Sequence, residues 1–381
     1  MNEKIYAHTK SDENGKPLSE EQWQPLEEHL NAVAQFAARE AVVFGAEAFA
    51  KTTGLLHDIG KDSPEFQAYI RNKRPSVDHK RAGAQAAVDI YGRAFGKLLA
   101  YCILGHHGGL PNAAEESIIY DPKPAPSGLH LSSPYLKERP DKPVFHKPFL
   151  QTGEGQVAYM QLLIRMAFSC LVDGDYLDTE KFMSPETAAL RGEPVPIQTL
   201  YELFQPALAK LQNYDIAFPV NRARRDVLNA CLENGNKGPG FYTLTVPTGG
   251  GKTLSSMAFA LEQVKRCGMR RIVYAVPFTT VTEQIAGVFR EIFDKNTVGR
   301  SLVLEHHSNL DLAGKTEDEK DAVRLLSENW DTPLIVTTTV QLLESLFPTC
   351  RRASAKFIIL RKALLYLTRR KRCPIRCFGL F

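Results

Sequence analysis

The segment LEEHLNAVAQFAAREAVVFGAEAFAKTTGLLHDIG, residues 26–60, sets the character of the first half of the chain. Its apolar residues recur at helical spacing, and this spacing continues to about Val88. Gly60 is well placed to end a helix. Helical spacing resumes at Gln156 and runs through QLLIRMAFSCLVDGDYL. We therefore predict that the first half of the chain is mostly α-helical.

The second half has a different texture, which begins after about Asp215. Short β-rich runs, namely FYTLTV (241–246), RIVYAV (271–276) and PLIVTTT (333–339), alternate with segments of helical length. Strands that alternate with helices in this way predict a parallel sheet in an α/β fold.

The chain of 381 residues is long enough for two hydrophobic cores. We predict a multidomain protein, with an all-α domain at residues 1–215 and a partial α/β domain at residues 216–350. Residues 120–149 hold seven prolines and are predicted to form a long surface excursion of the first domain. The remaining segment, residues 351–381, fits neither pattern.

Basic residues are distributed unevenly along the chain. The net charge is +4, yet residues 351–381 contain ten Lys or Arg and no Asp or Glu. The other 350 residues therefore carry a net charge of −6. The overall charge is thus no argument for nucleic-acid binding.

The sequence shows neither a targeting segment nor a regular cysteine pattern. No stretch approaches the roughly 20 uninterrupted apolar residues of a membrane span, and the N-terminal MNEKIYAHTKSDENGK lacks the apolar core of a secretory signal. Seven cysteines are scattered without the paired spacing of a disulfide framework or a zinc ribbon. We expect a soluble, cytoplasmic, monomeric protein with reduced thiols and no membrane partner.

Several of the ten histidines lie beside carboxylates at helix-compatible positions. Imidazole nitrogens and carboxylate oxygens suit divalent first-row transition metals, and one Asp can bridge two ions. Two ions about 3.5–4 Å apart activate water and stabilise both oxygens of a phosphodiester displacement. Each histidine taken singly favours a structural role without a metal. The candidate ligands are His29, His57, Asp58, His79, His106, His107 and, from the segment DGD, Asp173 or Asp175.

The segment VPTGGGKT, residues 246–253, lies between a predicted strand and the helical run LSSMAFALEQVKR. In that context the N–H groups of a glycine turn surround a β-phosphate, the lysine reaches the β/γ-phosphates and the threonine holds Mg²⁺. Val246 departs from the usual Gly or Ala, and a glycine-rich turn without a nucleotide is the alternative. The predicted ligands of ATP with Mg²⁺ are Pro247, Thr248, Gly249, Gly250, Gly251, Lys252 and Thr253.

In their order, these segments resemble the HD-nuclease/helicase effector family of type I CRISPR systems, in its subtype I-C branch. WQPLEEHL, GLLHDIGK, DHKRAGAQ, GHHGG and LVDGDYLDTE are similar to its successive nuclease motifs, and VPTGGGKT is similar to the phosphate loop of superfamily 2 helicases. The resemblance spans residues 23–347. It implies an HD-type metal-dependent nuclease domain followed by a partial first RecA-like helicase domain.

The resemblance also implies roles for single residues. Asp58 would be catalytic as the carboxylate that bridges two ions, and Lys61 would contact a substrate phosphate. A solvated lysine at a helix end is the alternative for Lys61. Asp175 is preferred to Asp173, because the family's segment reads aspartate, aromatic, aliphatic. One ion would be held by His29, His57, Asp58 and Asp175, and the second by Asp58, His79, His106 and His107.

Two later segments resemble helicase motifs that follow strands, VPFTTVTEQ (276–284) and TTTVQLLESLF (337–347). Hydroxyls and N–H groups at strand ends contact phosphates without reading bases. The histidine pair in EHHSNL (305–310) lies in the α/β half, and we interpret it as structural or as a surface feature of the family, not as a metal site. The predicted nucleic-acid contacts are Pro277, Thr279, Thr280, Gln284, Thr338 and Thr339.

The resemblance implies a nuclease-helicase of antiviral defence. Its HD domain would degrade single-stranded DNA with two divalent ions (Mn, Fe, Co or Ni), and a crRNA-guided type I surveillance complex would recruit it. Two other functions fit the residues: an HD phosphohydrolase acting on nucleotides with a regulatory P-loop domain, or an inactive DNA-binding remnant. An assay of nucleotides beside single-stranded DNA separates these functions.

Residues 351–381 stand where a DExD/H strand is due, yet they contain no acid. A basic amphipathic helix is one interpretation. Permitted codons for Ala355 to Pro374, read from the third base of the Ala355 codon, also encode EIHNIAKSVIIFDEAQTLP, an apolar strand that ends in DEAQ. We hypothesise that a frameshift between Phe347 and Lys356 truncated a longer protein, so that this tail has no selected fold. Very weak ATP turnover and no unwinding would follow.

Overall fold

The computed structural model describes residues 4–12, 14, 16–71, 77–111, 153–191, 195–295, 301–308, 326–346, 356, 360, 363–367 and 375–379. The chain divides into two compact units: Met1–Leu190 with Pro348–Ile358, and Arg191–Phe347 with Ile359–Phe381. The proline-rich stretch at 120–149 lies outside the described residues. No helix of the described part is long and apolar enough to cross a membrane.

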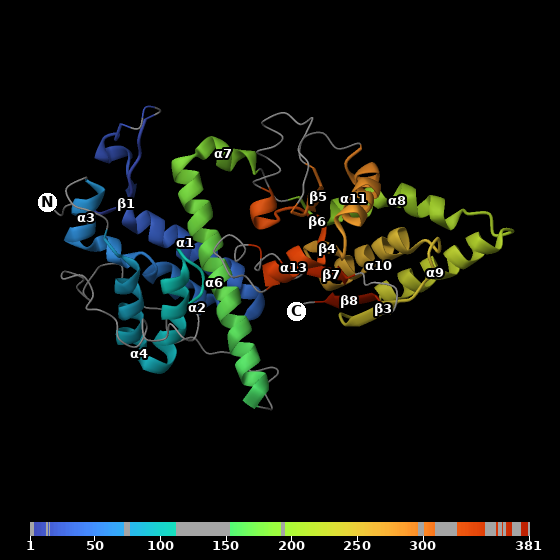
Figure 1. Cartoon of the computed structure of the whole chain (residues 1–381), viewed down its shortest axis with the longest axis horizontal. Helices are drawn as coiled ribbons and strands as arrows, with labels where there is room; N and C mark the ends of the chain where they lie inside the picture. Colours follow the sequence, from blue (N-terminus) through green and yellow to red (C-terminus); the bar gives the residue numbers. More distant parts are fainter. Residues whose placement is uncertain are drawn as a thin grey trace. The chain divides into compact units, whose positions relative to one another are not determined.

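The first unit is helical, as predicted, apart from a short antiparallel strand pair, β1 with β2 (Figure 1). Helices α1 and α2 pack against each other and against α6. Leu26, Leu30, Val33 and Ala37 are at most 1% exposed, because they recur on one face of α1. The elements are β1 Tyr6–His8, η1 Glu20–Gln22, β2 Gln24–Pro25, α1 Leu26–Ala41, η2 Val42–Phe44, α2 Glu47–Leu56, η3 Ile59–Asp62, α3 Pro64–Ile70, α4 Lys80–Gly105, α6 Gly153–Met183 and α7 Pro185–Leu190.

The segment α4 turns back on itself at Gly92. A straight helix of its 26 residues would be about 39 Å long. Gly92 interrupts the helix with φ 77° and ψ 164°, a conformation that essentially only glycine adopts. Beyond the turn, a Cβ on Gly96 would lie 2.4 Å from the carbonyl oxygen of Ala87. The two halves of α4 therefore lie side by side (Figure 1), which brings the two ends of the segment together.

The second unit contains a six-stranded sheet in the order β3-β8-β7-β4-β6-β5. Strand β4 pairs in parallel with β6 and β7, and β5 pairs in parallel with β6, whereas β8 is antiparallel to β7 and β3. The predicted parallel sheet is thus confirmed, with one antiparallel strand inserted. The strands are β3 Phe241–Leu244, β4 Arg271–Val276, β5 Val303–His306, β6 Leu334–Thr338, β7 Ala363–Leu367 and β8 Ile375–Gly379.

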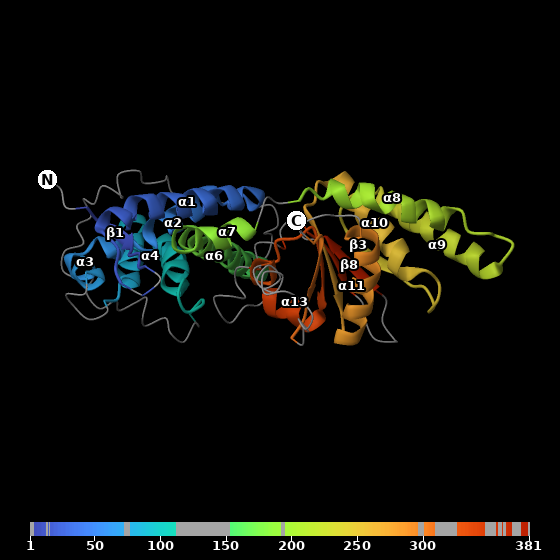
Figure 2. The ribbon, with the colours of Figure 1, turned by 90° about the horizontal axis from the view of Figure 1, so that it is seen from above.

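Helices cover this sheet, and α9 packs against α10 (Figure 2). Leu200 and Phe204 of α8 are buried in the core of the second unit, where the Phe204 ring stacks 6.2 Å from that of Phe293. The domain boundary therefore precedes α8, not residue 215 as predicted, because periodicity does not reveal which core a helix face meets. The helices are α8 Gln198–Gln212, α9 Pro219–Gly235, α10 Lys252–Cys267, α11 Thr279–Phe293 and α13 Thr339–Leu346.

The last segment of the chain contributes two strands to the sheet, although we expected no selected fold there. Strand β7 lies between β4 and β8, and its residues Ala363, Leu364, Leu365 and Tyr366 are buried. The ring of Tyr366 stacks on that of Tyr274 in β4 at 4.0 Å. An apolar run suffices for this pairing, because the edge of β4 that faces away from β6 would be unpaired without β7.

Candidate metal centre and phosphate loop

The HD dipeptide lies at the turn between α2 and η3. Helix α2 ends at Leu56, and His57 caps it with a backbone N–H that donates to the carbonyl of Thr53. The prediction that Gly60 ends this helix is wrong, because Gly60 lies within η3. A Cβ on Gly60 would lie 2.1 Å from the carbonyl oxygen of His79, so glycine permits the start of α4 to approach the HD turn.

A first group of ligand-type side chains surrounds one oxygen of Asp58. Asp58 Oδ2 lies 3.6 Å from His29 Nε2 and 3.5 Å from His57 Nε2. The same two nitrogens lie 3.6 and 3.8 Å from Asp175 Oδ1. All four residues are buried. Asp173 is buried too, but it does not belong to this group.

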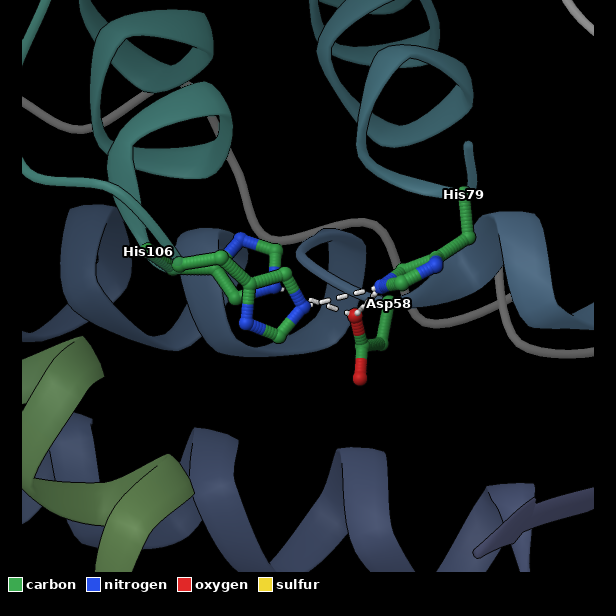
Figure 3. A group of neighbouring side chains, drawn as sticks. Asp58, His79 and His106 are labelled. Atoms are coloured by element: carbon green, nitrogen blue, oxygen red, sulfur yellow. Dashed lines mark hydrogen bonds and ion pairs between the residues drawn. The ribbon is translucent and has the colours of Figure 1, made fainter. Parts of the chain in front are cut away.

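A second group surrounds the other oxygen of Asp58. His79 Nε2 lies 3.3 Å and His106 Nε2 3.2 Å from Asp58 Oδ1, and Figure 3 shows both rings directed at this atom. His79 Nε2 also lies 2.9 Å from His107 Nε2. His79 precedes α4 and His106 follows it, so the turn at Gly92 assembles this group. Asp58 is the residue common to both groups.

Divalent ions fit these donors. Four atoms of the site are buried without a hydrogen-bond partner: Nε2 of His29, His57 and His106, and Oδ1 of Asp58. Burial of an unpaired polar atom is energetically costly unless a bound group interacts with it. The Nδ1 atoms of the same three histidines are engaged at 2.7 Å by Asp178 Oδ2, at 2.8 Å by the carbonyl of Gly54 and at 2.5 Å by that of Ile103. Ring orientation of this kind is typical of metal-binding histidines.

The charges of the site are strongly perturbed. Burial opposes ionisation of Asp58, but Lys61 and His57 outweigh it and hold the pKa of this carboxyl well below its ordinary range. Burial lowers the pKa of His29, yet its hydrogen bond to Asp178 and the neighbouring carboxylate of Asp58 outweigh that effect and raise the pKa to about 9. Burial also lowers the pKa of His106, and it lowers that of His107 to about 3.

Lys61 lies differently from the expectation. Its side chain is 5% exposed, and Nζ lies 2.7 Å from Asp58 Oδ2 and 3.1 Å from His8 Nε2. In this structure the ammonium pairs with the carboxylate shared by the two groups, and its contact with a substrate phosphate stays a prediction. The short η3 turn is responsible, because it brings residues three apart onto the same side.

Three polar residues around the first group were not predicted: His8, Gln24 and Asp178. Asp178 accepts hydrogen bonds from His29 and Gln24, and Gln24 contacts His8. The spacing of Asp175 and Asp178 on α6 carried a usable signal, since residues three apart share a helix face. His8 and Gln24 carried none, because only the fold brings β1 and β2 to the centre.

The phosphate loop follows β3 and leads into α10, as predicted. Gly249 and Gly251 have φ values of 84° and 79°, which require glycine. A cavity of about 480 Å³ is lined by Thr248, Gly249, Gly251, Lys252 and Thr253, among others. Pro247 and Gly250, the other two predicted ATP ligands, stabilise the turn, because the N–H of Gly250 donates to the carbonyl of Pro247 at 3.1 Å.

The predicted nucleic-acid contacts lie at the carboxyl edge of the sheet. Val276 at the end of β4 is in register with Thr338 at the end of β6, so Pro277 and Thr339 follow neighbouring strands. Thr279 opens α11, and Thr280 is exposed one position further on.

Two of these residues have other contacts than expected. Thr338 is 7% exposed, and its hydroxyl accepts a hydrogen bond from the N–H of Gln341, capping α13. Gln284 lines the cavity of the phosphate loop. Position at a strand end therefore does not by itself make a side chain available to DNA.

The second histidine pair lies at β5. His307 Nε2 lies 2.8 Å from Glu305 Oε1, and Glu283 completes a third group of ligand-type side chains. Arg290 Nη1 pairs with Glu305 Oε2 at 2.7 Å. The carboxylate of Glu305 is therefore paired within the chain, and the role predicted for this segment stays a prediction.

Two families match parts of the chain. The HD domain family matches residues 26–143, and the DEAD/DEAH box helicase family matches residues 217–363. The CRISPR-associated nuclease/helicase Cas3 of Haloferax volcanii is 26% identical over 422 residues, which cover 92% of this chain and 45% of that protein. The chain thus spans less than half the length of this relative.

Solved structures support the same fold. Crystal structures of T. fusca Cas3 with ATP and with ADP are each 18% identical to this chain, with TM-scores of 0.59 and 0.60. Each match covers 97% of this chain and 46% of the solved chain. The predicted order, a helical HD domain followed by an α/β helicase domain, is confirmed.

Proposed function

Because this chain is Cas3-like, with an HD domain followed by a DEAD/DEAH box helicase domain, we propose that it acts as a CRISPR-associated nuclease-helicase whose HD domain degrades single-stranded DNA. One observation carries the proposal: Asp58 belongs to both groups of ligand-type side chains. A carboxylate shared between two sets of histidines suits a pair of divalent ions and hydrolysis of a phosphodiester.

The chain supplies seven ligands for such a pair. When bound, the ions provide an activated water and neutralise charge on the attacking and leaving oxygens. Lys61 and the histidines keep the Asp58 carboxylate ionised and hence able to bridge. Imidazole and carboxylate ligands accept Mn, Fe, Co or Ni. His29, His57, Asp58 and Asp175 would hold one ion, and Asp58, His79, His106 and His107 the other.

The two groups differ in exposure, and this difference suggests how DNA approaches. The first group is entirely buried, whereas the second includes the exposed His107 and the half-buried His79. A scissile phosphate would therefore reach the centre from the side of His79 and His107. Base-specific contacts are not required there, because the backbone phosphate is the reacting group.

The helicase half would bind ATP with Mg²⁺ and contact single-stranded DNA. Lys252 and Thr253 line the phosphate-loop cavity, and the strand ends at Pro277, Thr279 and Thr339 lie at the same edge of the sheet. Recruitment by a crRNA-guided type I surveillance complex, and action as a monomer, belong to the same proposal.

The test uses the full chain with Mn²⁺ and no ATP. We expect it to bind two ions and to degrade single-stranded DNA. We expect Asp58→Ala to abolish cleavage, because no other carboxylate among the described residues belongs to both groups. Lys252→Ala is the matched control and should cut at the parental rate. Cleavage by Asp58→Ala at the parental rate would contradict the proposal. Hydrolysis of nucleotides but not DNA would favour a phosphohydrolase, and two bound ions without cleavage an inactive remnant.

A further inference from the structure

We propose that His8, Gln24 and Asp178 form a positioning chain, which orients His29 and Lys61 around the first group of metal ligands. This chain of side chains starts at Lys61 and ends at His29. None of its three middle residues is itself in a ligand group. The inference rests on the proposed metal site and names residues that hold it in shape.

The direction of every hydrogen bond in the chain follows from its first member. Lys61 can only donate, so His8 Nε2 accepts a hydrogen bond from Lys61 Nζ at 3.1 Å. His8 must then carry its own proton on Nδ1, which donates to Gln24 Oε1 at 2.7 Å. This contact fixes the Gln24 amide, whose Nε2 donates to Asp178 Oδ2 at 2.8 Å.

The same oxygen of Asp178 sets the tautomer of His29. It accepts from His29 Nδ1 at 2.7 Å, so Nε2 is the nitrogen that would bind an ion once its proton has left. At the other end of the chain, Lys61 Nζ holds Asp58 Oδ2 at 2.7 Å. Two ligands of the first group are therefore oriented by one continuous set of hydrogen bonds.

Packing holds this chain in place. Gln24 and Lys61 are 6% and 4% exposed, and the ring of His8 packs edge-on against that of His29 at 4.8 Å. Gln67 ties β1 to the η3 turn, since its amide donates to the carbonyls of Tyr6 and Lys61, each at 2.8 Å. The N-terminal strand pair thus belongs to the metal centre.

The arrangement predicts an unequal effect on the two ions. Gln24 acts through Asp178 on His29, which is a ligand of the first group alone. The second group instead takes His79 and His106 from the two ends of α4. Loss of outer partners of metal ligands costs about 10–100-fold in affinity. Breaking the chain at Gln24 should therefore weaken one ion by about that factor and leave the other nearly unchanged.

The experiment is a calorimetric titration of the full, metal-free chain with Mn²⁺. For Gln24→Ala we expect one of two ions to bind about 10–100-fold more weakly. His8→Leu should behave in the same way, and His8→Gln should restore binding, since an amide can accept from Lys61 and donate to Gln24. Trp23→Phe, at the residue directly before β2, is the control and should bind both ions like the parent.

The outcomes separate the two proposals. Parental affinity for both ions in Gln24→Ala and His8→Leu overturns the positioning role. Equal weakening of both ions, with no recovery in His8→Gln, also overturns it, because that result reports a general loss of structure. A parent chain that binds no Mn²⁺ overturns the proposed metal site itself.

Discussion

His79 and His106 direct their Nε2 atoms to one oxygen of Asp58, at 3.3 and 3.2 Å, from opposite ends of α4. The second ligand group therefore depends on the reversal at Gly92. No residue of that turn touches the proposed ions, yet the turn decides whether their ligands meet.

Replacement of Gly92 should weaken both the fold and the second group. Gly92→Ala meets no neighbouring atom within 4 Å, but alanine is strained at φ 77° and ψ 164°. We expect a loss of about 1–3 kcal/mol in the free energy of unfolding of the HD unit. Urea denaturation measures it. Gly108→Ala, which has open space and no such φ, should change stability by less than about 0.5 kcal/mol; equal losses would refute this account.

The two aspartates of DGD should differ in their effect on metal binding. Asp175→Asn removes a ligand of the first group, and we expect a Mn²⁺ affinity at least about tenfold lower, with loss of DNA cleavage. Asp173→Asn is the matched isosteric control and should bind two ions. Metal content after dialysis, measured by elemental analysis, checks both variants. If Asp173→Asn loses an ion and Asp175→Asn keeps two, the ligand assignment is wrong.

Metal binding should release protons. Because the pKa of His29 is raised to about 9, its ring is protonated at neutral pH before a metal binds. A proton must leave for Nε2 to bind the ion, so the apparent affinity should rise about tenfold per pH unit up to pH about 9. Calorimetry in buffers of different ionisation enthalpy counts the released protons. Asp178→Asn should reduce this number, and a pH-independent affinity would exclude the mechanism.

The stability of the metal-free chain should also depend on pH, and the contribution of His29 should fall as the pH rises. The folded pKa of His29 lies above its ordinary value of 6.5, so its contribution is complete below pH about 6.5 and is lost as the pH rises through about 9. Burial lowers the pKa of His8 to about 4, so its contribution is present above pH about 6.5 and is lost as the pH falls through about 4. Thermal unfolding of His29→Gln and His8→Gln across pH separates the two effects.

ATP turnover by this 381-residue chain should be very weak. Lys252 and Thr253 line the phosphate-loop cavity, but none of the described residues that line it carries the carboxylate that Mg²⁺ requires in such motors. A phosphate-release assay with single-stranded DNA measures turnover. Vigorous DNA-stimulated hydrolysis that Lys252→Ala suppresses would contradict the expectation.

The nucleotide sequence around codon 355 tests the frameshift hypothesis. In the alternative frame, the codons of Ala363 to Leu367, which form β7, would encode the apolar run VIIF that leads into DEAQ. We expect that frame to stay open and to encode further helicase motifs. Early stop codons in it would leave the basic segment as a genuine element of the protein.

Local pattern determined the fold class. The helical spacing of residues 26–60 and the strand, glycine turn and helix around VPTGGGKT both arise from contacts between residues near in sequence. Periodicities of 3.6 and 2.0 residues are visible without any tertiary information. The HD turn and the phosphate loop were recognisable for the same reason.

Tertiary packing decided how the metal centre is assembled. Only the reversal at Gly92 brings His79 to His106, and only the packing of α6 on α1 decides that Asp175, not Asp173, faces His29. Residues two apart on a helix point to different faces, so their spacing cannot state which face meets the site. Lys61 reaches Asp58 because the η3 turn brings residues three apart onto the same side. The strand pair at the N-terminus reaches the centre through contacts distant in sequence.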